Sequence, residues 1–209
     1  MSKPSLILIG AGGHARACID VIEHLNDFEI AGLIGKEEEL KNEYMGYHVI
    51  ASDNDLPALA KQYQYAIITV GQIESGLLRQ RLYRQALALG FKFPTIISPT
   101  AYVSHHTMVG DGTIVMHGAI VNASATVGNN CIINSNALIE HDAIVADNCH
   151  ISTGAIVNGA ANIGFGSFVG SGSIIKQGTR LGSNSVVGMG ITVRHDHTEN
   201  SRILTSREL

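Results

Sequence analysis

Residues 101–196 decide the fold. Cut every six residues, they read AYVSHH TMVGDG TIVMHG AIVNAS ATVGNN CIINSN ALIEHD AIVADN CHISTG AIVNGA ANIGFG SFVGSG SIIKQG TRLGSN SVVGMG ITVRHD. All sixteen hexads carry an aliphatic residue in the third place, and the first place is Ala, Thr, Cys or Ser in every hexad but the last. A period of six fits neither a helix nor a strand, whereas hexapeptide repeats are the sequence signature of a parallel β-helix.

The repeat also predicts where each residue of a hexad lies. Three hexads make one triangular coil, with the aliphatic residue inside, the small residue at the crowded wall and the last three residues at the corner. Those corner places are rich in Gly, Asn, Ser and Asp, which turn a backbone at low cost. Residues eighteen apart should therefore stack on strands that pair at roughly 4.8 Å. Cys131 and Cys149 share the first place of the sixth and ninth hexads, so we expect small buried thiols on adjacent coils.

The bulk properties narrow the class of protein. The chain of 209 residues is long enough for one solenoid and one small domain. Its formal net charge of −4 and the lack of a basic run argue against nucleic-acid binding. It has no apolar run of membrane-spanning length, and MSKPSLILIGAGG lacks the features of a signal peptide. We therefore expect a cytoplasmic protein with no membrane partner, and three cysteines suggest no disulfide framework.

The N-terminal part resembles the start of a nucleotide-binding domain. Ser5–Ile9 is a short apolar run typical of a buried strand, a GAGGH turn follows, and Ala15–Leu25 carries apolar residues at helical spacing. Strand, glycine turn and helix open a Rossmann-like βαβ unit, in which amides at the helix N-terminus face a phosphate. The turn is not a full GxGxxG, so a tight turn without a ligand is the alternative.

The rest of this part extends the α/β pattern. Glu29–Ile34 and Tyr65–Val70 are predicted strands, and Leu56–Gln62 and Leu77–Leu89 are predicted helices. We expect the second of these helices to have a polar side formed by Arg79, Arg81 and Arg84. The predicted domains are an α/β Rossmann-like domain over residues 1–97, an all-β parallel β-helix over 98–196 and a C-terminal tail over 197–209.

A second glycine turn follows the last predicted strand. Parallel α/β sheets bind ligands beyond the carboxyl ends of their strands. Both glycine turns should therefore line one crevice that suits a nucleotide or an anionic sugar. The predicted substrate-binding residues are Gly10, Gly12, Gly13, His14, Gly71 and Gln72.

One corner of the solenoid departs from the small-residue pattern. Glu140, His141 and Asp142 fill the corner of the seventh hexad. A carboxylate that holds one ring nitrogen of a histidine protonated leaves the other nitrogen free to take a proton, which is the usual arrangement of a general base. The alternative is a solvated corner without a function.

A metal site would need three convergent ligands. His117, His141 and His150 belong to the third, seventh and ninth hexads, which do not stack on one corner column because stacking requires a separation of three hexads. We therefore expect no metal. A metalloenzyme of the carbonic anhydrase type and a noncatalytic scaffold are the competing hypotheses.

The whole chain resembles one family of left-handed β-helix acyltransferases. These are the bacterial sugar acetyltransferases related to sialic acid O-acetyltransferase and to the N-acetyltransferases of nucleotide-linked 4-amino-sugars. The resemblance rests on the GAGGHA turn, the GQI turn with the LRQRLY helix, the junction PTIISPTAYVS and the segment INSNALIEHDAIVADNCHISTGAIVNG. Two stretches differ from the family: Ile34-Gly35-Lys36 stands where members that bind UDP-sugars carry an aspartate pair, and HDHTENSRILTSREL replaces a Gly-x-Pro-Ala ending.

The resemblance implies a left-handed solenoid, a homotrimer with active sites between subunits, and acetyl-CoA as the donor. It implies His141 as the general base with Asp142 as its orienting acid and Glu140 as the alternative. His150 would lie near the acetyl group, Gly159 and Gly172 would contact coenzyme A, and Gly12, Gly13 and His14 would hold the nucleotide or sugar.

The implied reaction is a direct acetyl transfer without an acyl-enzyme. We expect N-acetylation of an amino-deoxy-sugar linked to a nucleotide, a precursor of a bacterial surface carbohydrate. The alternative acceptor is a hydroxyl of sialic acid or of a related nonulosonate.

Overall fold

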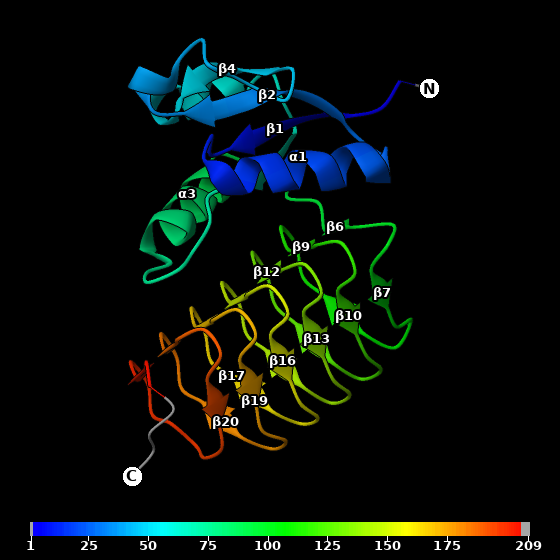
Figure 1. Ribbon diagram of the computed structural model, residues 1–209. Coiled ribbons are helices and arrows are strands. Elements are labelled where there is room, and N and C mark those ends of the chain that lie inside the picture. The colour runs from blue at the N-terminus through cyan, green and yellow to red at the C-terminus, as the bar shows by residue number, and fades with distance from the viewer. Residues whose placement is uncertain (1, 206–209) are drawn as a thin grey trace. The chain divides into compact units, whose positions relative to one another are not determined.

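The computed structural model describes residues 2–205, which form two compact units (Figure 1). The first unit runs to Gly71 and resumes over Leu77–Ile96, and the second comprises Gln72–Gly76 and the chain from Ile97 onward. The short segment Gln72–Gly76 thus belongs to the solenoid unit, although it lies inside the predicted domain 1–97. Residues 206–209 of the predicted tail lie outside the described residues.

The first unit is an α/β domain built on a five-stranded sheet with the order β3-β4-β2-β1-β5. All neighbouring strands are parallel except β3 and β4. The strands are β1 (Ser5–Ile9), β2 (Glu29–Gly35), β3 (Glu43–Tyr44), β4 (Tyr47–Ser52) and β5 (Tyr65–Ile68). The helices are α1 (Gly13–Leu25), α2 (Leu56–Leu59) and α3 (Leu77–Ala88), with short 3-10 turns η1 (Glu37–Glu39) and η2 (Asp53–Asp55).

This strand order confirms the Rossmann-like prediction. Strand β1 pairs with β2 on one side and with β5 on the other, which creates the switch point where such sheets bind ligands. Leu6–Ile9 are fully buried, as expected for a strand covered on both faces. Helix α1 buries one face against the sheet through Ala15, Cys18, Ile19, Val21 and Ile22. We did not predict β3 and β4.

The second unit is a β-helix, as the hexads predict. Each hexad contributes one two-residue strand from its second and third places, and one further strand extends the solenoid at each end. In chain order these strands are β6 (Ile96–Ile97), β7 (Tyr102–Val103), β8 (Met108–Val109), β9 (Ile114–Val115), β10 (Ile120–Val121), β11 (Thr126–Val127), β12 (Ile132–Ile133), β13 (Leu138–Ile139), β14 (Ile144–Val145), β15 (His150–Ile151), β16 (Ile156–Val157), β17 (Asn162–Ile163), β18 (Phe168–Val169), β19 (Ile174–Ile175), β20 (Arg180–Leu181), β21 (Val186–Val187), β22 (Thr192–Val193) and β23 (Arg202–Ile203).

Three parallel sheets form the faces of the solenoid, seen as a stack of coils in Figure 1. We call them face 1 (β7, β10, β13, β16, β19, β22), face 2 (β8, β11, β14, β17, β20) and face 3 (β6, β9, β12, β15, β18, β21, β23). Strands that pair on successive coils lie eighteen residues apart in the sequence, as in the pairing of Ile132 with His150. The third-place aliphatic residues form one continuous core together with the small first-place residues. Cys131 and Cys149 lie within it as free, buried thiols, as predicted.

The corners follow one backbone rule. From Gly112 to Gly190, the sixth residue of every hexad has a positive φ, whether it is Gly, Asn, Ser, Ala or Asp. Gly adopts this left-handed conformation without strain, and Asn and Asp tolerate it better than most residues. Asp142 is the one acidic residue in this row, with φ 60°.

The segment predicted as a C-terminal tail contains a further strand. Within 197–205, Arg202–Ile203 form β23, which pairs with β21 and continues face 3.

Among residues 2–205, no helix is long and apolar enough to cross a membrane.

Candidate active site

His141 lies on the corner that joins β13 of face 1 to β14 of face 2. Its Nδ1 is 2.8 Å from Oδ2 of Asp142, and both side chains are more than half exposed. The left-handed backbone of Asp142 belongs to the corner turn itself, so the fold places this carboxylate beside the ring.

The contact with Asp142 defines the chemistry of the ring. A carboxylate accepts a hydrogen bond, so Nδ1 carries the proton and Nε2 keeps a lone pair. The hydrogen bond to Asp142 is the largest effect and raises the pKa of His141. Desolvation lowers the pKa less strongly, and the negative charges of Asp142 and Glu140 add smaller increases. This pair can therefore act as a general base above the raised pKa.

Glu140, the alternative orienting acid, points to a different partner. Its Oε2 accepts a hydrogen bond from Nδ2 of Asn122 at 3.0 Å and a longer one from the backbone N–H of His141 at 3.3 Å. Asn122 occupies the same corner place one coil earlier, eighteen residues before Glu140. Of the two acids, Asp142 is the one that contacts the imidazole.

Gly159 lies one coil after His141, on the same corner column. The coils are joined there by a hydrogen bond from the backbone N–H of Ala160 to the carbonyl of His141 at 3.0 Å. A Cβ atom on Gly159 would lie 2.8 Å from Cε1 and 2.9 Å from Nε2 of His141. The imidazole therefore occupies the space that a side chain at position 159 would need.

His150 is a buried residue of face 3, only 6% exposed. Its Nδ1 lies 2.5 Å from the carbonyl oxygen of Gln72, and Nδ2 of Asn134 lies 3.1 Å from its Nε2. A carbonyl can only accept, so Nδ1 donates to Gln72 and Nε2 accepts from Asn134. The edge of the His150 ring also packs against Phe168, with ring centroids 5.2 Å apart.

The side chain of Gln72 fixes the segment Gln72–Gly76 to the rest of the solenoid unit. Nε2 of the buried Gln72 side chain donates to the carbonyl of Gly166 at 3.0 Å. Asn134 is not among the predicted site residues, because Asn is an ordinary corner residue in this repeat. The signal that would find it is its place sixteen residues before His150, which sets it on the adjacent coil.

One chain does not bring the two predicted histidines together. His141 and Gly159 lie on corners between faces 1 and 2, whereas the outward side chain of His150 is on face 3 and Gly172 is on a corner between faces 3 and 1. In a triangular coil, the corner between faces 1 and 2 is opposite face 3. The residues expected to serve acetyl transfer therefore form two sets on opposite sides of each solenoid.

In the first unit, the two glycine turns lie side by side. A Cβ on Gly71 would be 3.5 Å from Cβ of His14. Gly10 has φ 124°, and a Cβ there would be 2.7 Å from the backbone nitrogen of Val70, so this position requires glycine. Gly12 and Gly13 face open space instead, and α1 begins there without a side-chain cap.

The prediction for Arg79 was wrong. Instead of lying on a polar side of α3, Arg79 is 1% exposed, and its Nη1 donates to the carbonyls of Ile68 and Val70 at 2.7 and 2.9 Å. These carbonyls come at the carboxyl end of β5, where the strand stops pairing. The guanidinium satisfies backbone groups that would otherwise be buried without partners.

A polar cavity of about 450 Å³ lies beyond the carboxyl ends of β2 and β4. Its lining includes Gly35, Lys36, Ser52, Asp53, Asn54 and Arg81. A Cβ on Gly35 would be 3.2 Å from Cβ of Ala11, so the cavity begins next to the first glycine turn. Burial raises the pKa of Asp53, and the positive charge of Arg81 opposes this shift. We did not predict this cavity.

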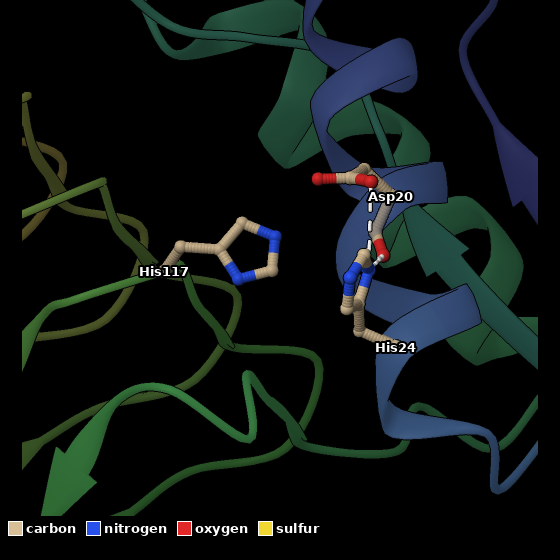
Figure 2. Close-up of side chains that lie close together, drawn as sticks. All are labelled: Asp20, His24 and His117. Carbon is tan, nitrogen blue, oxygen red and sulfur yellow. Dashed lines mark hydrogen bonds and ion pairs between the residues drawn. The ribbon is translucent and has the colours of Figure 1, made fainter.

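Two further histidines, His24 and His117, have partners within their own units. In α1, Nδ1 of His24 lies 2.9 Å from the carbonyl of Asp20 and 3.5 Å from its Oδ1, the contacts dashed in Figure 2. In the solenoid, Nδ1 of His117 lies 2.7 Å from Oγ of Ser98. Among residues 2–205, His117, His141 and His150 do not converge on a common point that a metal ion could occupy.

Two known protein families match separate parts of the chain. Residues 5–86 match the PglD N-terminal domain family, and residues 161–194 match the hexapeptide repeat of succinyl-transferases. A comparison of the sequence with curated proteins found no significant match.

Solved structures of similar proteins cover nearly the whole chain. The acetyltransferase domain of PglB from Neisseria gonorrhoeae, solved with acetyl coenzyme A, has 28% identity and a TM-score of 0.87 over 96% of each chain. PerB from Caulobacter crescentus, solved with CoA and GDP-perosamine, has 28% identity and a TM-score of 0.89, covering 96% of this chain and 94% of its own. A histidine-to-asparagine mutant of perosamine N-acetyltransferase from the same organism has 27% identity and a TM-score of 0.90, covering 96% and 93%.

Proposed function

We propose that this chain, an acyltransferase that joins a PglD-type N-terminal domain to a hexapeptide-repeat solenoid, transfers acetyl from acetyl-CoA to the amine of a nucleotide-linked amino-sugar. The observation that carries the proposal is the pair formed by His141 and Asp142, 2.8 Å apart on a solenoid corner. Its setting is a fold shared with PglB and PerB.

In this mechanism His141 acts on the acceptor amine. Its Nε2 removes a proton as the amine nitrogen attacks the carbonyl carbon of the thioester. The C–N bond forms, the C–S bond breaks, and the leaving thiolate takes up a proton to give free coenzyme A. Asp142 fixes the tautomer and stabilises the imidazolium that forms. Holding both substrates in one site supplies much of the remaining rate.

The first unit would bind the nucleotide part of the acceptor. The start of α1 suits a diphosphate, because a helix N-terminus favours anions and the backbone of Gly12 and Gly13 faces open space there. The cavity that begins next to this turn offers Lys36 and Arg81 as cations, with Asp53 and Asn54 as hydrogen-bonding groups for a nucleoside. Gly71 lies against His14 and would complete the same binding edge.

The solenoid would assemble as a homotrimer, with each active site built from two chains. Face 1 carries an outward apolar row with Tyr102, Ile120 and Ile174 exposed by 58%, 39% and 36%, and such patches mark protein interfaces. A second chain on this face would bring a new surface beside the His141 corner. His150 and Gly172 of one subunit could then contact acetyl-CoA, while His141 of the neighbouring subunit faces the acetyl group.

Trimer assembly and the shared site are tested together by complementation. His141→Ala and His150→Ala are each expected to be inactive alone and to recover partial activity when co-expressed. A site contained within one chain predicts no recovery. Analytical ultracentrifugation should give a trimer, and a monomeric active enzyme would contradict this part of the proposal.

The acceptor is tested by thiol release from acetyl-CoA with purified protein. The panel comprises GDP- and UDP-linked 4-amino-sugars, free sialic acid and CMP-sialic acid. Turnover with an amino-sugar is expected, whereas turnover only with the sialic acids would make this an O-acetyltransferase. We propose the cytoplasm as the site of this reaction between acetyl-CoA and a nucleotide-linked sugar.

A further inference from the structure

We propose that Gly159 is a positioning residue for His141: the absence of a side chain at position 159 lets the imidazole lie against the next coil, within hydrogen-bonding distance of Asp142. The inference rests on the proposed role of His141 as the base. It assigns Gly159 a steric task that is separate from contact with coenzyme A.

The contacts of this glycine distinguish it from other glycines of the solenoid. At Gly164 and Gly182, a Cβ would meet backbone atoms of the next coil at 2.5 and 2.3 Å, so those glycines are needed for coil stacking. At Gly159, the three nearest atoms all belong to the ring of His141. The φ of Gly159 lies outside the left-handed region, so alanine fits its backbone and the ring is what an added methyl group would meet.

The imidazole of His141, and not the backbone, would move to relieve the clash with a Cβ atom at position 159. His141 is an exposed side chain, and an exposed ion pair is too weak to hold it against a contact of 2.8 Å. The imidazole would rotate away from Asp142, while the coils would stay paired through Ala160 and the carbonyl of His141. The charged groups beside the ring are Glu140 and Asp142, and Glu140 is held by Asn122, so it would not follow the ring.

The test combines Gly159→Ala with an NMR titration of the His141 ring in the full-length protein. The hydrogen bond to Asp142 raises the pKa of His141, so its loss should lower that pKa toward the ordinary value of about 6.5. Asp142→Asn should lower the pKa in the same way. The pH-independent kcat of Gly159→Ala should fall by about tenfold or more, with an unchanged melting temperature.

The matched control is Gly188→Ala, where a Cβ would meet nothing closer than 3.4 Å. In the Gly188→Ala variant, the pKa of His141 and the kcat should equal those of the wild type. An unchanged pKa in Gly159→Ala would overturn the proposal, and a raised KM for acetyl-CoA with that unchanged pKa would assign Gly159 to donor contact alone. Full activity of His141→Ala would instead refute the catalytic base, whereas the titration would still report on the position of the ring.

Discussion

The two units of this protein place their candidate functional groups in different ways. In the solenoid, each residue meets those eighteen places away, so the neighbours of His141 follow from counting along the chain. In the N-terminal unit, neighbours come from unrelated segments, as where Gly10 meets Val70 and Arg79 meets Ile68. In a periodic fold, function is marked by side chains that break the repeat. In the α/β unit, it is marked by backbone turns whose surroundings the local sequence does not reveal.

The largest expected effect comes from breaking the inside–outside alternation of the solenoid. Ile163 is fully buried in the core, and a carboxylate there would have no partner. A buried unpaired charge costs several kcal/mol, a large share of the roughly 5–15 kcal/mol that stabilises a domain. Ile163→Asp should therefore fail to fold, as measured by circular dichroism and solubility.

The neighbouring residue provides the control for this test. Asn162 precedes Ile163 in β17 and is half-buried on the outer side of the solenoid. Asn162→Asp should keep a cooperative melt close to that of the wild type. A native melt for Ile163→Asp would contradict the assignment of the solenoid interior.

A smaller effect on stability should distinguish alanine substitutions at two glycines of the first turn in the α/β unit. In Gly10→Ala, the new Cβ would clash with Val70 and the residue would keep a φ of 124°, so we expect a loss of roughly 2–5 kcal/mol in unfolding free energy. Gly13→Ala adds a methyl group in open space on a helix and should leave stability unchanged or slightly higher. Denaturant unfolding measures both, and equal stabilities would refute this geometry of the turn.

The strands of the solenoid were more predictable than those of the α/β unit, because in the solenoid the position of each residue follows from the repeat. The hexads predicted every strand from β7 to β22, because one repeat fixes pleat, register and core together. They could not predict β23, since Arg202–Ile203 pair with face 3 after the repeat has ended. In the α/β unit, β1 and β2 were recognised from apolar runs and α1 from apolar residues at helical spacing. Strand β4 was missed because only Val49, Ala51 and Ser52 of its six residues are buried.

The candidate site was predictable only in part. The departure of residues 140–142 from the small-residue pattern pointed to His141, but not to which acid contacts its ring. That choice depends on the left-handed turn at Asp142 and on the hydrogen bond that holds Glu140 to Asn122. The burial of Arg79 was not predictable from helical periodicity, since it depends on the carbonyls of Ile68 and Val70 at the end of β5.

The smallest expected effect is a shift in pH dependence. Asp142→Asn removes the charge and weakens the hydrogen bond that raises the pKa of His141. The base works when neutral, so activity should rise with pH through this pKa, and the acid limb of kcat/KM should move to lower pH in the variant. The plateau should also fall, because the tautomer is less well fixed. A pH–rate profile measures both, and an acid limb that stays in place would show that Asp142 does not tune the base.

The central claim is that His141 is the general base. The most direct measurement is the rate of thiol release by His141→Asn with the acceptor that the wild type prefers, beside a melting curve of both proteins. Because His141 is exposed, we predict an unchanged melting temperature and a rate about 100- to 10,000-fold lower. A variant that retains its fold and a rate within about threefold of the wild type would contradict the account.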